Sequence, residues 1–331
     1  MSNKLKSGLQ AIVPLVAAIL IFYYLYKDIE GEVILEALKG TNALWFSAAM
    51  FLGLLGFWLR AWRWKNLIAT NETIEVKTIP IFWSLMFGNL INLLFPRAGE
   101  VARCGGVSKV YPIKFGKIFG TVVLERTIDM VFMLFIIALA FLLEGGIFIE
   151  IFESLISLSA IKSFVSEYVY WAILLMLILL VLAVLTYLKF KKTTLIGKIR
   201  QFLRQFVSGL ETLIHMKNKV GFWVATVLIW TIYFLMMYWM ALSIPSTNSL
   251  SATSVLMVLV MGSIGMIAPV QGGIGTFHAM VAFILLYYGI SEEQGKVFAM
   301  LVHTSQIMIV LILGGISFLY LFRKKKVTLN Q

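Results

Sequence analysis

Long runs of apolar residues recur along this 331-residue chain and are separated by short polar segments. Continuous runs of roughly 18 or more apolar residues are typical of helices that span a bilayer, whereas membrane β-strands alternate apolar and polar residues. We therefore expect an all-α polytopic membrane protein and neither a water-soluble domain nor a barrel. The segments expected to span the bilayer are 9–26, 42–62, 118–143, 168–188, 220–242 and 297–322.

Two further apolar segments, 79–95 and 251–288, are interrupted by proline and glycine. Non-helical backbone inside a bilayer is tolerated only where it contacts protein or lines a water-filled cavity. The first is therefore expected to be re-entrant, entering and leaving on the cytoplasmic side, and the second to be either two short spans or a second re-entrant hairpin. The chain has about eight transmembrane helices on the first interpretation, or six plus two re-entrant hairpins on the second.

The charged residues between the apolar runs predict the topology. Basic clusters at 60–65, 189–204 and 323–326 indicate cytoplasmic ends, whereas the acidic segments 28–36, 144–153 and 292–293 indicate the outside. Both termini are therefore expected in the cytoplasm. We expect an external acidic loop at 27–41, an external surface helix at 147–156, a cytoplasmic amphipathic segment at 190–218 and a cytoplasmic tail at 323–331. The net charge of +12 lies in these short loops, so we expect no nucleic-acid binding and a single transmembrane domain over 1–331.

The order of the segments predicts an inverted repeat. One span, an interrupted segment and another span occur in both halves, with opposite orientation. The interruptions share a spacing, Pro96–Arg97–Ala98–Gly99 and Pro269–Val270–Gln271–Gly272. Interrupted segments at corresponding positions of inverted halves indicate a transporter's binding site near the bilayer midplane. We expect the gating backbone at Pro96, Gly99, Pro269, Gly272, Gly273 and Gly275.

The span 118–143 contains three charged residues, Glu125, Arg126 and Asp129. Each charge at a helix centre costs roughly 2.5–3.5 kcal/mol on insertion scales, so these side chains should face the bundle interior. One interpretation is an internal salt bridge that includes Arg103 or Arg97. The other is a polar pocket in which arginines bind a phosphate headgroup and carboxylates orient them or carry protons. The predicted substrate-binding residues are Asn92, Arg97, Glu100, Arg103, Glu125, Arg126 and Asp129.

Other polar residues of the apolar segments have less specific interpretations. Arg60 and Arg63 stand at a basic span end and are expected to anchor the interface. His278 and His303 are candidates for a proton relay. Cys104 is the single cysteine, so the sequence predicts no disulfide framework, and we expect no metal site and no cofactor.

Four motifs occur in order along the chain: Arg60-x-x-Arg63–Trp64, Asn92-x-x-x-Pro96–Arg97-x-Gly99–Glu100-x-x-Arg103, Glu125–Arg126-x-x-Asp129 and Pro269-x-x-Gly272–Gly273-x-Gly275. Together, over residues 5–325, they resemble the lysylphosphatidylglycerol synthase transmembrane-region family. The chain is similar to the flippase half of the bacterial synthase/flippase. The family often has an acidic residue where His278 stands here. No soluble aminoacyl-transfer domain follows Lys326, so we do not expect lysyl-lipid synthesis.

The resemblance implies a flippase-like protein of a bacterial or archaeal cytoplasmic membrane. It would translocate an anionic phospholipid or a polyprenyl-phosphate-linked substrate and would not be an enzyme. One alternative is a membrane enzyme of lipid or polyprenyl-phosphate glycan synthesis, with Glu125 and Asp129 holding a divalent metal. The other is an accessory subunit of such an enzyme. The candidate partners are membrane lipids, a synthetic enzyme and a second copy of the chain.

Overall fold

A computed structural model describes residues 31–70, 74–155, 212–216, 218–268 and 270–323, with a few isolated positions elsewhere. The spans expected at 9–26 and 168–188, most of the amphipathic segment at 190–218, the tail after residue 323 and Pro269 lie outside the described residues. All regular secondary structure in the described part is helical, in agreement with the predicted fold class.

Four helices are long and apolar enough to cross a membrane: α3 (Ala43–Ile68), α6 (Phe115–Leu143), α11 (Lys219–Ser243) and α14 (Glu292–Arg323). Each has at least 25 residues, about 37 Å of helix, against a hydrocarbon core of about 30 Å. They match four of the predicted spans. Exposed large apolar residues such as Leu134, Phe135 and Leu142 on α6 are suited to contact with lipid chains.

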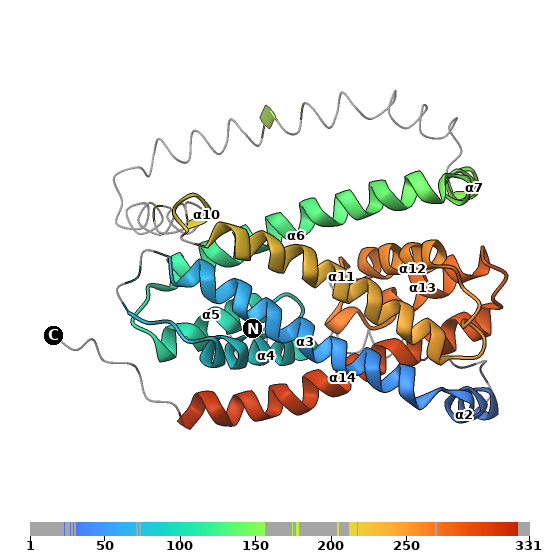
Figure 1. Cartoon of the computed structure of the whole chain (residues 1–331), viewed down its shortest axis with the longest axis horizontal. Helices are drawn as coiled ribbons and strands as arrows, with labels where there is room; N and C mark the ends of the chain where they lie inside the picture. Colours follow the sequence, from blue (N-terminus) through green and yellow to red (C-terminus); the bar gives the residue numbers. More distant parts are fainter. Residues whose placement is uncertain are drawn as a thin grey trace.

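The helices α3 and α11 hold the same place in the two halves of the chain and pack side by side (Figure 1). Both begin at an asparagine that caps the helix. Asn42 Oδ1 accepts hydrogen bonds from the backbone N–H groups of Leu44 and Trp45 at 3.0 and 3.3 Å. Asn218 Oδ1 accepts one from Gly221 at 2.9 Å. Each asparagine therefore satisfies helix N–H groups that have no partner within the helix.

Two helical hairpins are present among the described residues, and the predicted segment 79–95 supplies only one arm of the first. The first comprises α4 (Thr78–Leu94) and α5 (Gly99–Val110), and the second comprises α12 (Ala252–Gly265), the short 3₁₀ turn η1 (Gln271–Gly273) and α13 (Thr276–Leu286). The longest arm, α4, has 17 residues and is about 25 Å long. All the arms are therefore shorter than the four helices that are long and apolar enough to cross a membrane.

Small residues allow the arms to approach closely. A Cβ atom on Gly88 of α4 would lie 2.6 Å from the carbonyl oxygen of Gly99 of α5. A Cβ on Gly265 would likewise lie 2.7 Å from the carbonyl oxygen of Thr276. Both hairpins therefore require glycine at a contact between their arms.

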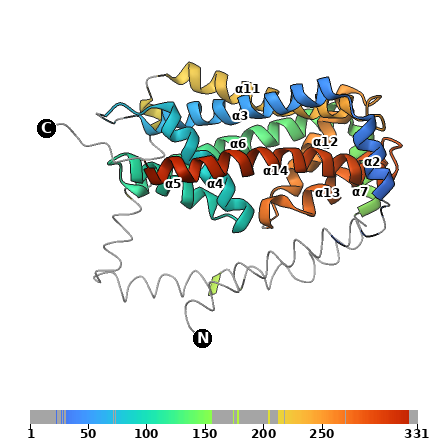
Figure 2. The same ribbon diagram turned by 90° about the horizontal axis from the view of Figure 1, so that it is seen from below.

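Each hairpin packs on both α6 and α14. The first contacts α14 through α4 and α6 through α5, and the second contacts α14 through α13 and α6 through α12. The inverted repeat stays a prediction. Each hairpin also has its own apolar core, which includes Ile81, Leu85 and Val107 in the first hairpin and Val258 and Val281 in the second. Figure 2 shows the hairpins α4–α5 and α12–α13 side by side along the bundle, with their turns facing each other.

Two short helices flank the bundle. The sequence predicts an acidic loop over 27–41, but residues 31–40 form the helix α2 (Gly31–Gly40), which has no buried residue. Charge alone cannot distinguish a loop from a surface helix, and the apolar residues Val33, Ile34 and Ala37 of α2 pack against the core at helical spacing. The surface helix predicted at 147–156 is present as α7 (Gly145–Leu155).

Candidate functional site

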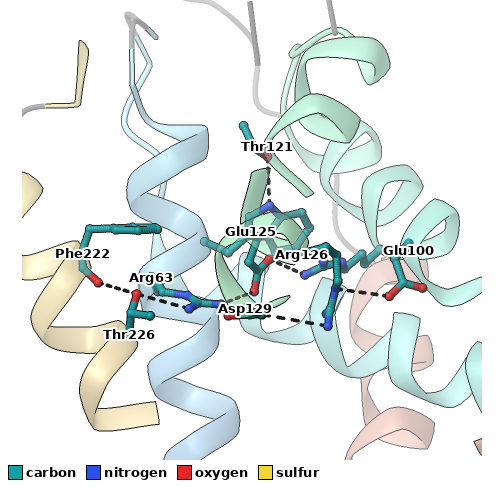
Figure 3. Close-up of polar contacts among 10 residues, drawn as sticks. Arg63, Glu100, Thr121, Glu125, Arg126, Asp129, Phe222 and Thr226 are labelled. Atoms are coloured by element: carbon teal, nitrogen blue, oxygen red, sulfur yellow. Dashed lines mark hydrogen bonds and ion pairs between the residues drawn. The ribbon is translucent and has the colours of Figure 1, made fainter. Parts of the chain in front are cut away.

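A buried network of ion pairs joins α3, α5 and α6. Glu125 is fully buried and uses both carboxylate oxygens: Oε1 lies 3.1 Å from Arg63 Nη2 and Oε2 lies 2.9 Å from Arg103 Nη1. Arg63 Nη2 also lies 2.7 Å from Asp129 Oδ1. Figure 3 shows Arg63 of α3 pointing toward Glu125 and Asp129 of α6. The predicted internal salt bridge is therefore present, with Arg103 rather than Arg97 as the partner of Glu125.

Neutral groups complete the surroundings of the two buried arginines. Arg63 Nη1 donates to Thr226 Oγ1 on α11 at 3.3 Å, and the Arg63 guanidinium lies 5.7 Å from the centre of the Phe222 ring. The Arg103 guanidinium lies 4.5 Å from the centre of the Trp64 ring, within the range of a cation–π contact. Trp64 is fixed by its indole N–H, which donates to Thr121 Oγ1 at 3.0 Å. The network thus holds both guanidinium groups in defined orientations.

The expectation that Arg63 anchors the membrane interface is wrong, because Arg63 is fully buried within α3. Arg60 is partly exposed and lines a cavity, and its role as an anchor stays a prediction. The two positions are one helical turn apart, so they lie on the same face of α3. The spacing of the two arginines indicates a shared helix face, but the basic residues at the end of the same apolar run suggested an interface instead.

A cavity of about 240 Å³ lies beside this network, at the point where the two hairpins meet. Polar residues line the side formed by α3, the first hairpin and α6, whereas the second hairpin contributes apolar and glycine residues. The lining residues are Arg60, Gly88, Asn89, Asn92, Arg97, Gly99, Glu100, Arg103, Arg126, Met266, Ala268, Val270, Gly272 and Gly273. Five of the seven predicted substrate-binding residues are thus brought together, while Glu125 and Asp129 hold arginines at its edge. The sequence predictions missed Arg60 and Asn89.

The tips of the hairpins contact each other. Arg97 Nη2 of the first hairpin donates to the carbonyl oxygen of Ile267, and Gln271 Nε2 of the second donates to the carbonyl oxygen of Leu94 at 3.1 Å. A Cβ atom on Gly272 would lie 2.7 Å from Leu93 Cδ2. The two predicted breaks therefore meet, and each hairpin donates one hydrogen bond to the other.

The turn of the first hairpin has an unusual backbone. Arg97 has φ of 63° and is the only non-glycine residue with positive φ in the described part of the chain. This left-handed conformation costs an L-residue about 1–2 kcal/mol. Asn92 Oδ1 accepts a hydrogen bond from the Gly99 N–H at 2.7 Å, which closes the turn at the start of α5. The turn thereby directs the Arg97 side chain toward the second hairpin.

The turn of the second hairpin contains three glycines with positive φ, Gly272, Gly273 and Gly275. His303 Nε2 on α14 lies 2.9 Å from the carbonyl oxygen of Gly272, and His278 Nδ1 accepts from the Gly275 N–H at 3.1 Å. The two imidazole rings are 4.9 Å apart between centroids and neither lines the cavity. The histidines support the glycine turn from behind, and the proton relay stays a prediction.

The charges around the cavity do not cancel. Arg60, Arg97, Arg103 and Arg126 line it and Arg63 lies behind it, whereas the carboxylates are Glu100, Glu125 and Asp129. These five arginines and three carboxylates leave an excess of two positive charges. Arg126 is paired only at long distances: its Nε lies 3.5 Å from Glu100 Oε1, and its Nη1 lies 4.0 Å from Asp129 Oδ2. Such distances exceed those of strong charge-assisted hydrogen bonds, about 2.7–2.9 Å.

Comparison with known proteins gives one family. No curated protein and no solved structure matches the chain. The family model described as "Lysylphosphatidylglycerol synthase TM region" matches residues 11–314, which include every helix of the cavity. With four helices long and apolar enough to span a bilayer, the match identifies an integral, multi-pass membrane protein. The chain belongs to the lysylphosphatidylglycerol synthase transmembrane-region family.

Proposed function

We propose that this protein is a flippase-like transporter that carries a lipid with an anionic phosphate headgroup across a cytoplasmic membrane. The observation that carries the proposal is the cavity between the hairpin tips, which four arginines and Glu100 line and beside which Arg63, Glu125 and Asp129 form ion pairs. The positive excess favours an anion, and arginine suits phosphate because it offers paired donors in a fixed plane.

The architecture supports transport because two oppositely placed hairpins meet at the cavity. In transporters built from inverted repeats, the substrate site lies at the repeat interface and is formed by broken helices. The tips are held by the reciprocal hydrogen bonds of Arg97 and Gln271. Separation of the tips would expose the cavity without unfolding either hairpin, because each has its own apolar core.

The enzyme hypothesis assigned a divalent metal to Glu125 and Asp129, and the contacts of these residues argue against that assignment. Both oxygens of Glu125 bind arginines, and Asp129 binds Arg63 at 2.7 Å. A cation placed there would displace these partners and would be repelled by the surrounding guanidinium groups. We therefore do not assign a metal-dependent reaction to this site. The accessory-subunit hypothesis predicts a stable complex with a synthetic enzyme on purification.

Transport can be tested in proteoliposomes that contain trace amounts of acyl-chain-labelled fluorescent lipids. Phosphatidic acid and phosphatidylglycerol serve as anionic probes and phosphatidylcholine as a probe without net charge. Dithionite bleaches only the labelled lipid in the outer leaflet. The rate at which labelled lipid of the inner leaflet becomes accessible to dithionite therefore measures translocation. We expect the wild-type protein to move an anionic probe faster than phosphatidylcholine. Equal rates for all three probes, or rates equal to those of protein-free vesicles, would refute the proposal.

Arg126 offers the most informative variant. Its side chain is 44% exposed and weakly paired, so Arg126→Gln should leave the fold intact while it removes one cavity charge. We expect slower transport of the anionic probes and an unchanged elution profile in detergent. Arg323→Gln, at the exposed end of α14, removes the same charge outside the cavity and should transport as the wild type does.

A further inference from the structure

Two buried hydrogen-bond donors at the cavity have no acceptor. Arg103 Nη2 and Asn89 Nδ2 are inaccessible to solvent and make no hydrogen bond, although the other Arg103 nitrogen, Nη1, binds Glu125. The Arg103 side chain is only 4% exposed. Buried polar groups are almost always paired, and an unpaired donor costs about 1–3 kcal/mol. Both residues line the cavity, as does Glu100, whose buried Oε2 also has no hydrogen-bond partner. An acceptor for the two nitrogens and a donor for Glu100 therefore belong in the cavity.

The size of the cavity limits what that acceptor can be attached to. Its volume of about 240 Å³ is roughly eight times the 30 Å³ that a water molecule occupies in the liquid. A phosphate with a small attached group needs less than this volume, so the cavity can take the headgroup of a lipid.

The charge of the surroundings specifies the headgroup further. Because the excess is two positive charges, a headgroup with a single negative charge leaves one arginine charge uncompensated. A phosphomonoester at neutral pH carries between about 1.5 and 2 negative charges and three terminal oxygens that accept hydrogen bonds. A diphosphate that links a lipid to another group also carries two. A phosphodiester carries one charge and two terminal oxygens.

From the unpaired donors and the uncompensated charge, we infer that the cavity selects a doubly charged lipid phosphate, a phosphomonoester or a diphosphate, over a phosphodiester. The inference rests on the proposed function but concerns binding alone. Arg103 Nη2 and Asn89 Nδ2 donate to terminal phosphate oxygens, and Arg126 exchanges its long contact with Glu100 for the phosphate.

Binding to the purified protein in detergent tests the inference without transport. The probes are short-chain phosphatidic acid as the monoester, phosphatidylglycerol of the same chains as the diester, and phosphatidylcholine as the reference without net charge. We expect phosphatidic acid to bind at least about tenfold more tightly than phosphatidylglycerol, because one more charge-assisted contact is made. Equal affinities would overturn the inference and leave anionic lipid transport standing. No preference for either anionic lipid over phosphatidylcholine would overturn both.

The pH dependence distinguishes charge from headgroup size. The second proton of a phosphomonoester dissociates near pH 6, whereas a diester has no such step. The preference for phosphatidic acid should therefore fall toward one between about pH 7.5 and pH 5. The arginines that line the cavity stay charged over this range, and Glu100 faces it from α5. His303 contacts the glycine turn behind it. Titration of protein groups changes the binding affinity of both lipids, so this effect cancels in the ratio of the two affinities. The ratio therefore reports the charge of the ligand. A ratio independent of pH would refute the monoester assignment.

Two variants with opposite expected signs exclude a general loss of structure. Arg126→Gln lowers the excess charge to one and should reduce the ratio of the affinities for phosphatidic acid and phosphatidylglycerol. Glu100→Gln raises the excess to three and should increase affinity for phosphatidic acid. Arg323→Gln should change neither. If the affinity for phosphatidic acid changes in the same direction in both cavity variants, the charge-matching argument is contradicted. Inorganic pyrophosphate and glycerol 3-phosphate, added as competitors, separate recognition of the phosphate alone from recognition of a lipid. Displacement of phosphatidic acid by either competitor supports the inference. If neither the competitors nor phosphatidic acid bind, the inference is refuted.

Discussion

The buried carboxylate Glu125 is expected to stabilise the fold more than any other ionised side chain of the site. It is completely buried and compensates Arg63 and Arg103 at 3.1 and 2.9 Å. In Glu125→Gln the size of the side chain is kept, but the negative charge is lost. Arg63 retains Asp129 at 2.7 Å. Arg103 retains only the face of Trp64, a contact that contributes about 0.5–2 kcal/mol.

Removal of one partner from a buried ion pair typically costs about 3–5 kcal/mol, because the other charge is left uncompensated. We expect Glu125→Gln to lose that amount of unfolding free energy, measured by titration from mild detergent into dodecyl sulfate with helical circular dichroism as the signal. Glu292→Gln is the matched control. The Glu292 side chain is 65% exposed and pairs with Lys296 at 2.7 Å, so loss of this pair should cost no more than about 0.5 kcal/mol of unfolding free energy.

The double variant Glu125→Gln with Arg103→Gln tests the reason for the loss. If the unpaired guanidinium is the cause, removing it should recover part of the stability, with a coupling of about 0.5–3 kcal/mol between the two positions. The reasoning is refuted if Glu125→Gln unfolds at the same detergent fraction as the wild type. It is also refuted if the two losses simply add.

Three further substitutions test the packing of the hairpins and the contact between Arg103 and the Trp64 ring. Gly88→Val places a side chain where even a Cβ atom would lie 2.6 Å from the carbonyl oxygen of Gly99, so we expect the hairpin arms to separate and the monodisperse peak in size-exclusion chromatography to be lost, whereas an unchanged peak would contradict the packing. Arg97→Gly removes the strain of φ 63° together with the contact to Ile267, whereas Arg97→Ala removes only the contact. In thermal unfolding, we therefore expect the glycine variant to be about 1 kcal/mol more stable than the alanine variant. The reverse order of stability would be inconsistent with a left-handed turn. Trp64→Phe keeps an aromatic face for Arg103 but loses the 3.0 Å hydrogen bond to Thr121, for which we expect a loss of about 1 kcal/mol in the same measurement; a loss as large as that of Glu125→Gln would show that the indole N–H has been undervalued.

Much of the architecture follows from apolar run length. The four long helices coincide with predicted spans because a continuous apolar run has few alternatives to a membrane helix. Proline and glycine show that a segment is interrupted, but they do not show whether its arms cross the membrane separately. The side of a helix on which a charge lies depends on its neighbours. For that reason Arg63 was taken for an interface anchor, although it is the partner of Glu125 and Asp129.

The prediction for Arg97 illustrates the same limit at a single residue. Its place beside Pro96 and Gly99 predicted a role at the break, and it does line the cavity. Its guanidinium, however, donates to a backbone carbonyl on the opposite hairpin rather than to a carboxylate. A contact between positions 97 and 267 depends on how the two halves of the chain assemble, which local spacing does not encode. Asn89 and Arg60 escaped prediction for the same reason.

The reciprocal tip contact has a consequence for the energy that transport requires. One of its hydrogen bonds comes from a charged donor and the other from a neutral amide. Together they contribute about 2–4.5 kcal/mol. If the tips part during transport, a contact of that strength leaves them open in roughly one molecule in thirty to one in two thousand. Thermal fluctuation then suffices to open the cavity, and a concentration difference of the lipid between leaflets can set the direction of net movement.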